Sequence, residues 1–142
     1  MVETDRRLRA LAGAVTAGAL LLTVAALALH LSWAGRVDGL DPLHSGDVVL
    51  ATLYPLAGLL VLWHRPRNPA GWVLLSAALV AVSLLAHQWS EIGLREPGSL
   101  PLVPLAVWLS AWTFVPYWAQ PSLATTPHTP APAPHSAHVL RL

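Results

Sequence analysis

The chain has no cysteine, no lysine and few charged residues of either sign. Without cysteine it can form no disulfide, no thiolate nucleophile and no cysteine-ligated metal site. Its formal net charge is only +1, so it lacks the basic stripe that nucleic-acid-binding proteins present. We therefore expect no nucleic-acid partner.

The shortage of charge also excludes an ordinary water-soluble domain. Charged residues make up 11% of the 142 residues, less than half of the roughly 25% that soluble domains carry. Hydrophobic types reach 55% and the mean hydropathy is +0.56, the opposite of a disordered composition. The composition predicts that this protein lies in a lipid bilayer.

Four apolar runs approach the length of a membrane span, for which a helix needs about 17–25 residues. They cover residues 11–33, 47–63, 71–89 and 102–119, after a charged segment at 1–10. Residues 121–142 are rich in Pro, Ala, Thr, Ser and His without apolar periodicity, which is typical of disorder. We predict an all-α membrane protein: an up-down bundle of four transmembrane helices within residues 11–120, followed by a disordered tail.

The first run also has the basic start of a secretory signal peptide. It is longer than the roughly 7–15 apolar residues of a signal sequence, however, and it ends in Trp33 without a small-x-small cleavage site. We expect a retained helix. At the other helix starts, Asn68 before Pro69 predicts an N-cap, and Ser45 or Asp47 is expected to cap the second span. Pro55 is expected to kink that span.

Arginine placement predicts the orientation in the membrane. Five arginines precede the first run or lie in the second loop: Arg6, Arg7, Arg9, Arg65 and Arg67. The other two loops hold Arg36 and Arg95 among several carboxylates. The positive-inside rule places the loop at 64–70 and both termini of a four-span protein in the cytoplasm.

Tryptophans support the same depths. Five of the seven lie at the ends of the runs, where indole rings favour the headgroup zone: Trp33, Trp63, Trp72, Trp89 and Trp118. Trp108 and Trp112 stand four residues apart inside the fourth run and share one helical face. We expect them to pack against lipid or a neighbour, and a pocket lining is the alternative.

Small and polar side chains recur at helical spacing inside the runs. The first run carries a seam of Ala12, Thr16, Ala19, Thr23, Ala26 and His30; the third carries Ser76, Ser83 and His87; the fourth carries Ala106, Ser110, Thr113 and Tyr117. Small residues let membrane helices approach closely, and hydroxyls can bond across the contact. We expect the seams of the first and third runs to face inward.

Three residues form a candidate sensing site: His30, His87 and Glu91, all near the extracytoplasmic boundary of the predicted topology. Histidine changes charge between about pH 5 and 8, so the group could sense protons. Imidazole and carboxylate could also bind zinc or copper, but no His-x3-His spacing supports a metal site, and none is predicted. Ordinary interfacial histidines are the third interpretation. Three tail histidines, His128, His135 and His138, hold no fixed geometry and are taken as incidental.

Signatures of catalysis are absent from the sequence. It has no Gly-rich phosphate loop, nucleophile elbow, HExxH helix or kinase signature, so no catalytic residue, cofactor or enzymatic activity is predicted. No run has a charge at its middle, which disfavours a transporter or channel.

Residues 55–118, roughly half of the chain, carry two motifs in order, Asn68-Pro-Ala-Gly-Trp72 and Pro97-Gly-Ser-Leu-Pro101. With these motifs the stretch resembles the membrane region of actinobacterial sensor histidine kinases. The family has an Arg-rich loop followed by an Asn-Pro-x-Gly-Trp-Leu-Leu motif, which opens a transmembrane helix. In this sequence the loop begins at His64, and the motif is matched by Asn68, Pro69, Gly71 and Trp72. The Pro-Gly-Ser-Leu-Pro segment at 97–101 and the tryptophans that follow it resemble the family's next loop and helix. The resemblance stops at residue 121, before any dimerisation or ATP-binding domain.

The resemblance implies the sensory input module of a two-component system in a bacterial plasma membrane, non-catalytic as it stands. Its expected partners are a full-length sensor kinase or a second copy of itself, bound through helix packing. The alternative is a small stand-alone membrane protein that scaffolds or modulates a partner.

Overall fold

The computed structural model describes residues 2–40 and 43–112, and every regular element in these ranges is helical. The elements are α1 (Val2–Trp33), α2 (Ser45–His64), α3 (Pro69–Ser76) and α4 (Ala78–Arg95), followed by a short apolar helix, Val103–Trp112. Because α3 and α4 run on from each other, three helical segments are long and apolar enough to cross a membrane: Glu3–Trp33, Ser45–His64 and Pro69–Arg95. The all-helical prediction is confirmed within these ranges.

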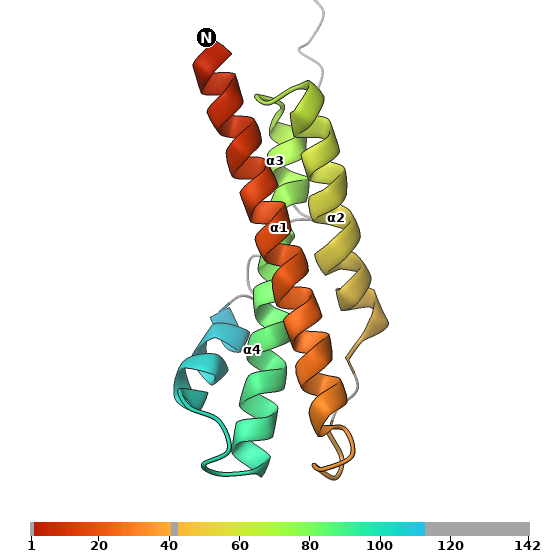
Figure 1. Ribbon diagram of the computed structural model, residues 1–142, viewed down its shortest axis with the longest axis vertical. Coiled ribbons are helices and arrows are strands. Elements are labelled where there is room, and N and C mark those ends of the chain that lie inside the picture. The colour runs from red at the N-terminus through yellow and green to blue at the C-terminus, as the bar shows by residue number, and fades with distance from the viewer. Residues whose placement is uncertain (1, 41–42, 113–142) are drawn as a thin grey trace, which may run out of the picture.

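The three long segments lie side by side and alternate in direction, with α3 and α4 stacked end to end beside α1 and α2 (Figure 1). The helix Val103–Trp112 turns back along the lower half of α4. It covers the first part of the predicted fourth span, whose remaining residues, 113–119, lie outside the described ranges, as does the predicted tail.

Helix α1 begins well before the apolar run that predicted it. Glu3 and Asp5 lie in its first turn, where carboxylates favour the positive end of the helix dipole. The Arg7 Nε–H donates to Glu3 Oε1 at 3.0 Å, one turn away. The helix therefore carries its charged first turns beyond the apolar segment instead of starting at residue 11.

The predicted caps have different outcomes. The Asn68 side chain accepts from the Ala70 backbone N–H at 3.0 Å with Pro69 in the first turn, which confirms that cap. At α2 the cap prediction was wrong, because His44 is the N-cap residue and makes no side-chain cap bond. Ser45 and Asp47 lie inside the first turn of α2 instead.

The small-residue seam of α1 faces the bundle interior as predicted. Its alanines and threonines are each at most 5% exposed: Ala12, Thr16, Ala19, Thr23 and Ala26. The hydroxyls of Thr16 and Thr23 donate to carbonyls one turn earlier in α1, both at 2.9 Å, so neither is buried unsatisfied. Small side chains thus let α1 pack closely against α2 and α4.

The expected inward seam of the third span was wrong for Ser76 and His87, whose side chains are exposed. With Gln88 and Ser90 as the polar exceptions, the buried residues of this segment are mainly apolar: Leu75, Ala77, Val80, Ala81, Leu84, Ala86 and Ile92. Apolar side chains can be buried between helices without the loss of a hydrogen bond. The Ser76 hydroxyl donates to the Val73 carbonyl of its own helix, so it needs no partner on a neighbouring helix.

Glycines set the spacing between α2 and α3. A Cβ added at Gly58 would lie 2.7 Å from the Leu75 backbone nitrogen and 2.8 Å from the Gly71 carbonyl oxygen. Since both are backbone atoms, only a residue without a side chain lets the two helices approach this closely.

Candidate functional site

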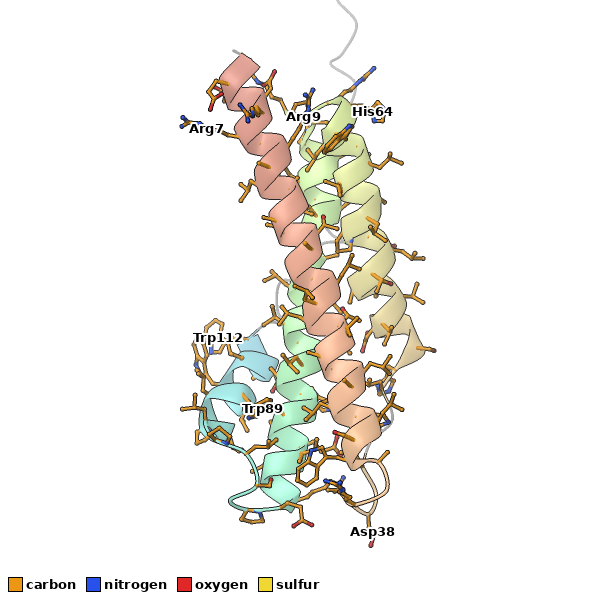
Figure 2. The ribbon with its side chains drawn as sticks, in the orientation of Figure 1. Arg7, Arg9, Asp38, His64, Trp89 and Trp112 are labelled. Carbon is orange, nitrogen blue, oxygen red and sulfur yellow. The ribbon has the colours of Figure 1, made fainter. Side chains whose placement is uncertain are left out.

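Charged side chains separate to the two ends of the bundle. Figure 2 shows Arg7, Arg9 and His64 at the end that holds the start of α1 and the α2–α3 loop, and Asp38 at the opposite end. That opposite end also holds the end of α4, with Glu91, Arg95 and Glu96. The predicted grouping of arginines is therefore a spatial grouping as well. We refer to these as the basic end and the acidic end.

A hydrogen bond between α1 and α4 lies toward the acidic end. The Nδ1 atom of His30 lies 3.0 Å from Oε1 of Gln88, which is 1% exposed. With the amide oxygen as acceptor, His30 donates through Nδ1–H, a role open to one neutral tautomer and to the imidazolium. His30 is thus fixed by a partner that does not change charge.

The other two predicted site residues belong to a separate group on α4. His87 Nε2 lies 4.0 Å from Oε2 of Glu91, and Glu91 Oε1 accepts from Arg95 Nη2 at 2.8 Å. The Glu91 side chain is 10% exposed, compared with 55% for that of His87. The structure therefore brings His87 and Glu91 together, while His30 bonds to the neighbouring Gln88 on another face of α4.

Arg95 extends this group to the loop between α1 and α2. Its Nη1 donates to the Asp38 backbone carbonyl at 2.9 Å. Gly39, at φ +68°, lies against the same guanidinium, since an added Cβ would be 3.1 Å from Nη1. Arg95 therefore joins the end of α4 to the α1–α2 loop and to Glu91 at once.

Sequence reasoning missed Gln88 and Arg95. An amide inside an apolar run was the available signal for Gln88, because a polar group in a membrane span needs a partner. Arg95 was counted only as a loop charge, and its contact with Asp38, 57 positions away, depends on how α1 and α4 pack.

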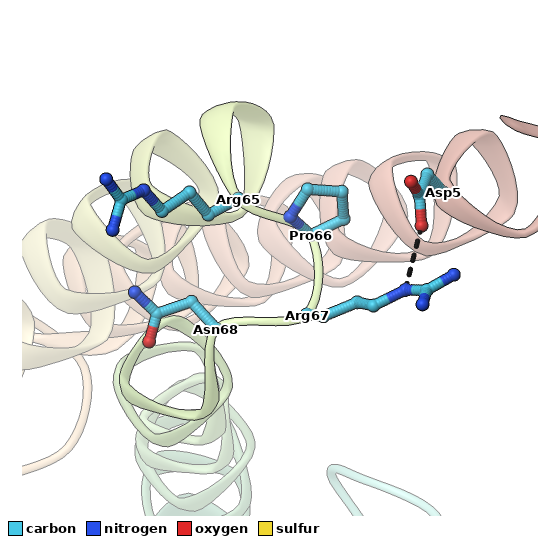
Figure 3. Close-up of a pocket in the computed structure, with 5 residues that line it drawn as sticks. All are labelled: Asp5, Arg65, Pro66, Arg67 and Asn68. Atoms are coloured by element: carbon cyan, nitrogen blue, oxygen red, sulfur yellow. Dashed lines mark hydrogen bonds and ion pairs between the residues drawn. The ribbon is translucent and has the colours of Figure 1, made fainter. Parts of the chain in front are cut away.

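The basic end also joins distant segments. Arg67 Nε donates to Oδ1 of Asp5 at 3.1 Å, tying the α2–α3 loop to the first turns of α1 (Figure 3). Trp72 holds the same loop, since its indole N–H donates to the Pro66 carbonyl at 3.0 Å.

The short helix is anchored on α4. The Trp89 indole N–H donates to the Pro101 carbonyl at 2.8 Å, and Val103 packs directly over Gly93. Trp108 and Trp112 lie on one face of this helix with ring centroids 5.9 Å apart, and both are more than half exposed. Both rings therefore lie on the surface of the described part of the chain.

Within the described residues no group of three or more His, Cys, Asp or Glu side chains has the arrangement of a metal site. Neither protein-family models, nor curated proteins, nor solved structures match this chain.

Proposed function

We propose that this protein is a multi-pass membrane protein whose basic end faces the cytoplasm. Three apolar segments of sufficient length and the separation of charge between the ends support this orientation. The helix Val103–Trp112 would begin a fourth span and return the chain toward the cytoplasm. In bacteria this membrane would be the plasma membrane.

The absence of natural cysteine makes the orientation directly testable. Thr4 is exposed at the basic end, and Gly35 is exposed near the acidic end with nothing within 4 Å of an added Cβ. We expect Gly35→Cys to react with a membrane-impermeant maleimide in intact cells and Thr4→Cys to react only after permeabilisation. The reverse pattern would overturn the orientation.

We further propose that the protein acts as a sensory input module of the kind found in actinobacterial sensor histidine kinases. The supporting observation is that α1 makes polar contacts to other segments at both ends and between them. It bonds to α4 through His30, to α2 through Thr16, whose Oγ1 lies 3.3 Å from the Pro55 carbonyl, and to the α2–α3 loop through Asp5. A displacement of α1 at one end would therefore alter contacts at the other.

Photo-cross-linking in native membranes tests this role. Ala14 lies on the exposed face of α1, opposite the buried seam, so a photoreactive residue there leaves the core intact. We expect capture of a membrane sensor kinase or of a second copy of this chain. Capture of one unrelated membrane protein would instead favour the scaffold or modulator alternative.

A further inference from the structure

The α2–α3 loop and the start of α1 together form a shallow, open pocket of about 350 Å³ (Figure 3). Its lining residues are Asp5, Arg65, Pro66, Arg67 and Asn68. Ligand pockets span about 300–1,000 Å³, so this one suits a small group such as a phosphodiester.

Positive charge at this end exceeds what the local carboxylates can pair. Two of the five arginines there are engaged, Arg7 with Glu3 at 3.0 Å and Arg67 with Asp5 at 3.1 Å. The remaining three make no ion pair with a carboxylate in the described part of the chain: Arg6, Arg9 and Arg65. Of these three, Arg65 lines the pocket.

Two hydrogen-bond donors extend to the same side of the loop. In Figure 3 the side chains of Arg65 and Asn68 lie on one side, whereas Arg67 turns the other way toward Asp5. The Asn68 Oδ1 atom is fixed by the Ala70 N–H, so its amide Nδ2 is the end left to donate. A guanidinium and an amide donor are the groups that bind a phosphate oxygen.

Neighbouring side chains are of the types that suit a pocket at headgroup depth. Trp63 and Trp72 flank the loop, and indole rings favour the membrane–water interface. The helices that leave the loop expose large apolar side chains, Leu60 on α2 and Val73 on α3, at 64% and 45%. Acyl chains would therefore meet apolar surface on the helices that adjoin the pocket.

We propose that this pocket binds the phosphate of an anionic phospholipid headgroup, with Arg65 and Asn68 as its donors and Arg67 held in place by Asp5. Basic pockets between membrane helices on the cytoplasmic side are suited to such headgroups. This inference rests on the membrane placement proposed above and is independent of the signalling role.

The first test measures ligand-induced stabilisation of the full chain in neutral detergent. Mixed micelles of phosphatidylglycerol should raise the midpoint of thermal unfolding with saturation, because a ligand that binds the folded state stabilises it. Phosphatidylcholine micelles should not. Inorganic phosphate at matched ionic strength distinguishes a lipid headgroup from free phosphate as the ligand. A saturable rise in the unfolding midpoint with phosphate alone would overturn the lipid assignment.

Variants test whether the pocket, rather than diffuse charge, is responsible. Arg65→Gln should raise the half-saturating phosphatidylglycerol concentration by about tenfold, the effect of one lost charge-assisted bond. Asn68→Asp should weaken binding similarly, since it keeps the capping oxygen but replaces the amide donor with a negative charge. Arg6→Gln is the matched control: it removes a positive charge at the same end but outside the pocket, and should change binding less than about twofold.

Equal weakening by Arg6→Gln and Arg65→Gln would overturn the site. If Arg65→Gln fails to fold, Arg65→Lys replaces it, because lysine keeps the charge but loses the bidentate geometry of arginine. Unchanged phosphatidylglycerol binding in both Arg65→Lys and Asn68→Asp would also overturn the site. Maleimide labelling in cells reports the membrane placement separately, so failure of one proposal is distinguishable from failure of the other.

Discussion

Gln88 on α4 accepts a hydrogen bond from His30 on α1 across a 3.0 Å contact between residues 58 positions apart. The bond joins a fully buried amide to a half-buried imidazole at the interface of the two helices. The neighbouring polar residues Gln88 and His87 of α4 therefore have different surroundings. Gln88 faces α1, while His87 is exposed beside Glu91.

Replacing Gln88 with Leu should destabilise the bundle because His30 loses its partner. Hydrogen bonds between membrane helices contribute about 0.6 kcal/mol on average and up to about 1.7 kcal/mol. The free energy of unfolding in mixed micelles, followed by circular dichroism, measures the loss. His87→Gln is the control, because its exposed side chain should change stability by less than about 0.5 kcal/mol. Equal losses in both variants would contradict the role given to Gln88.

The sensing hypothesis predicts a conformational response to pH that depends on histidine. Trp33 and Trp89 lie near His30 and His87 in sequence, so tryptophan emission between about pH 8 and pH 5 should report the change. We expect the double variant His30→Gln, His87→Gln to lose the response. His44, whose side chain is exposed at the start of α2, provides the control. The variant His44→Gln should keep the pH response. A response that persists unchanged in the double variant would rule the hypothesis out.

Close packing of α2 on α3 should make Gly58 intolerant of any side chain. In Gly58→Ala the new methyl group would meet the Leu75 and Gly71 backbones, which cannot rotate away as a side chain can. We expect a loss of about 1–3 kcal/mol in unfolding free energy.

Gly13→Ala is the matched control for this substitution. Nothing lies within 4 Å of an added Cβ there, and alanine is favoured over glycine in a helix by about 1 kcal/mol. This variant should be neutral or more stable. A comparable loss at both glycines would show that helix flexibility, and not packing, governs the effect.

A pair of threonine variants isolates the contact between α1 and α2. The single hydroxyl hydrogen of Thr16 is shared between the Ala12 carbonyl of its own helix and the Pro55 carbonyl of α2, whereas Thr23 bonds only within α1 among the described contacts. Thr16→Val should therefore cost more than Thr23→Val, by about 0.5 kcal/mol for a bond as long as 3.3 Å. Unfolding in mixed micelles measures the difference, and an equal or smaller cost for Thr16→Val would show that the contact with Pro55 contributes nothing.

Several features of this protein could be read from local pattern. Helix content follows from long apolar runs, since a chain in hydrocarbon must satisfy its backbone hydrogen bonds within each segment. The Asn68 cap and the α1 seam were predicted correctly because both depend on residues within a few positions of one another. The grouping of arginines at one end likewise needed only the order of the runs.

Other features depend on which helices meet and at what angle. Spacing along α3 and α4 offers Ser76 and His87 as readily as Ala77 and Gln88 for the inward face, and packing against the neighbouring helices selects the second pair. Gln88 finds His30, Arg95 finds Asp38 and Arg67 finds Asp5 only because α1 runs the length of the bundle. By itself the sequence determined the apolar character of the long helices, their helical form and their charged ends, because those follow from composition and short-range period. The tertiary structure alone decided which polar groups are partners, because no local sequence pattern predicts a contact between residues about 60 positions apart.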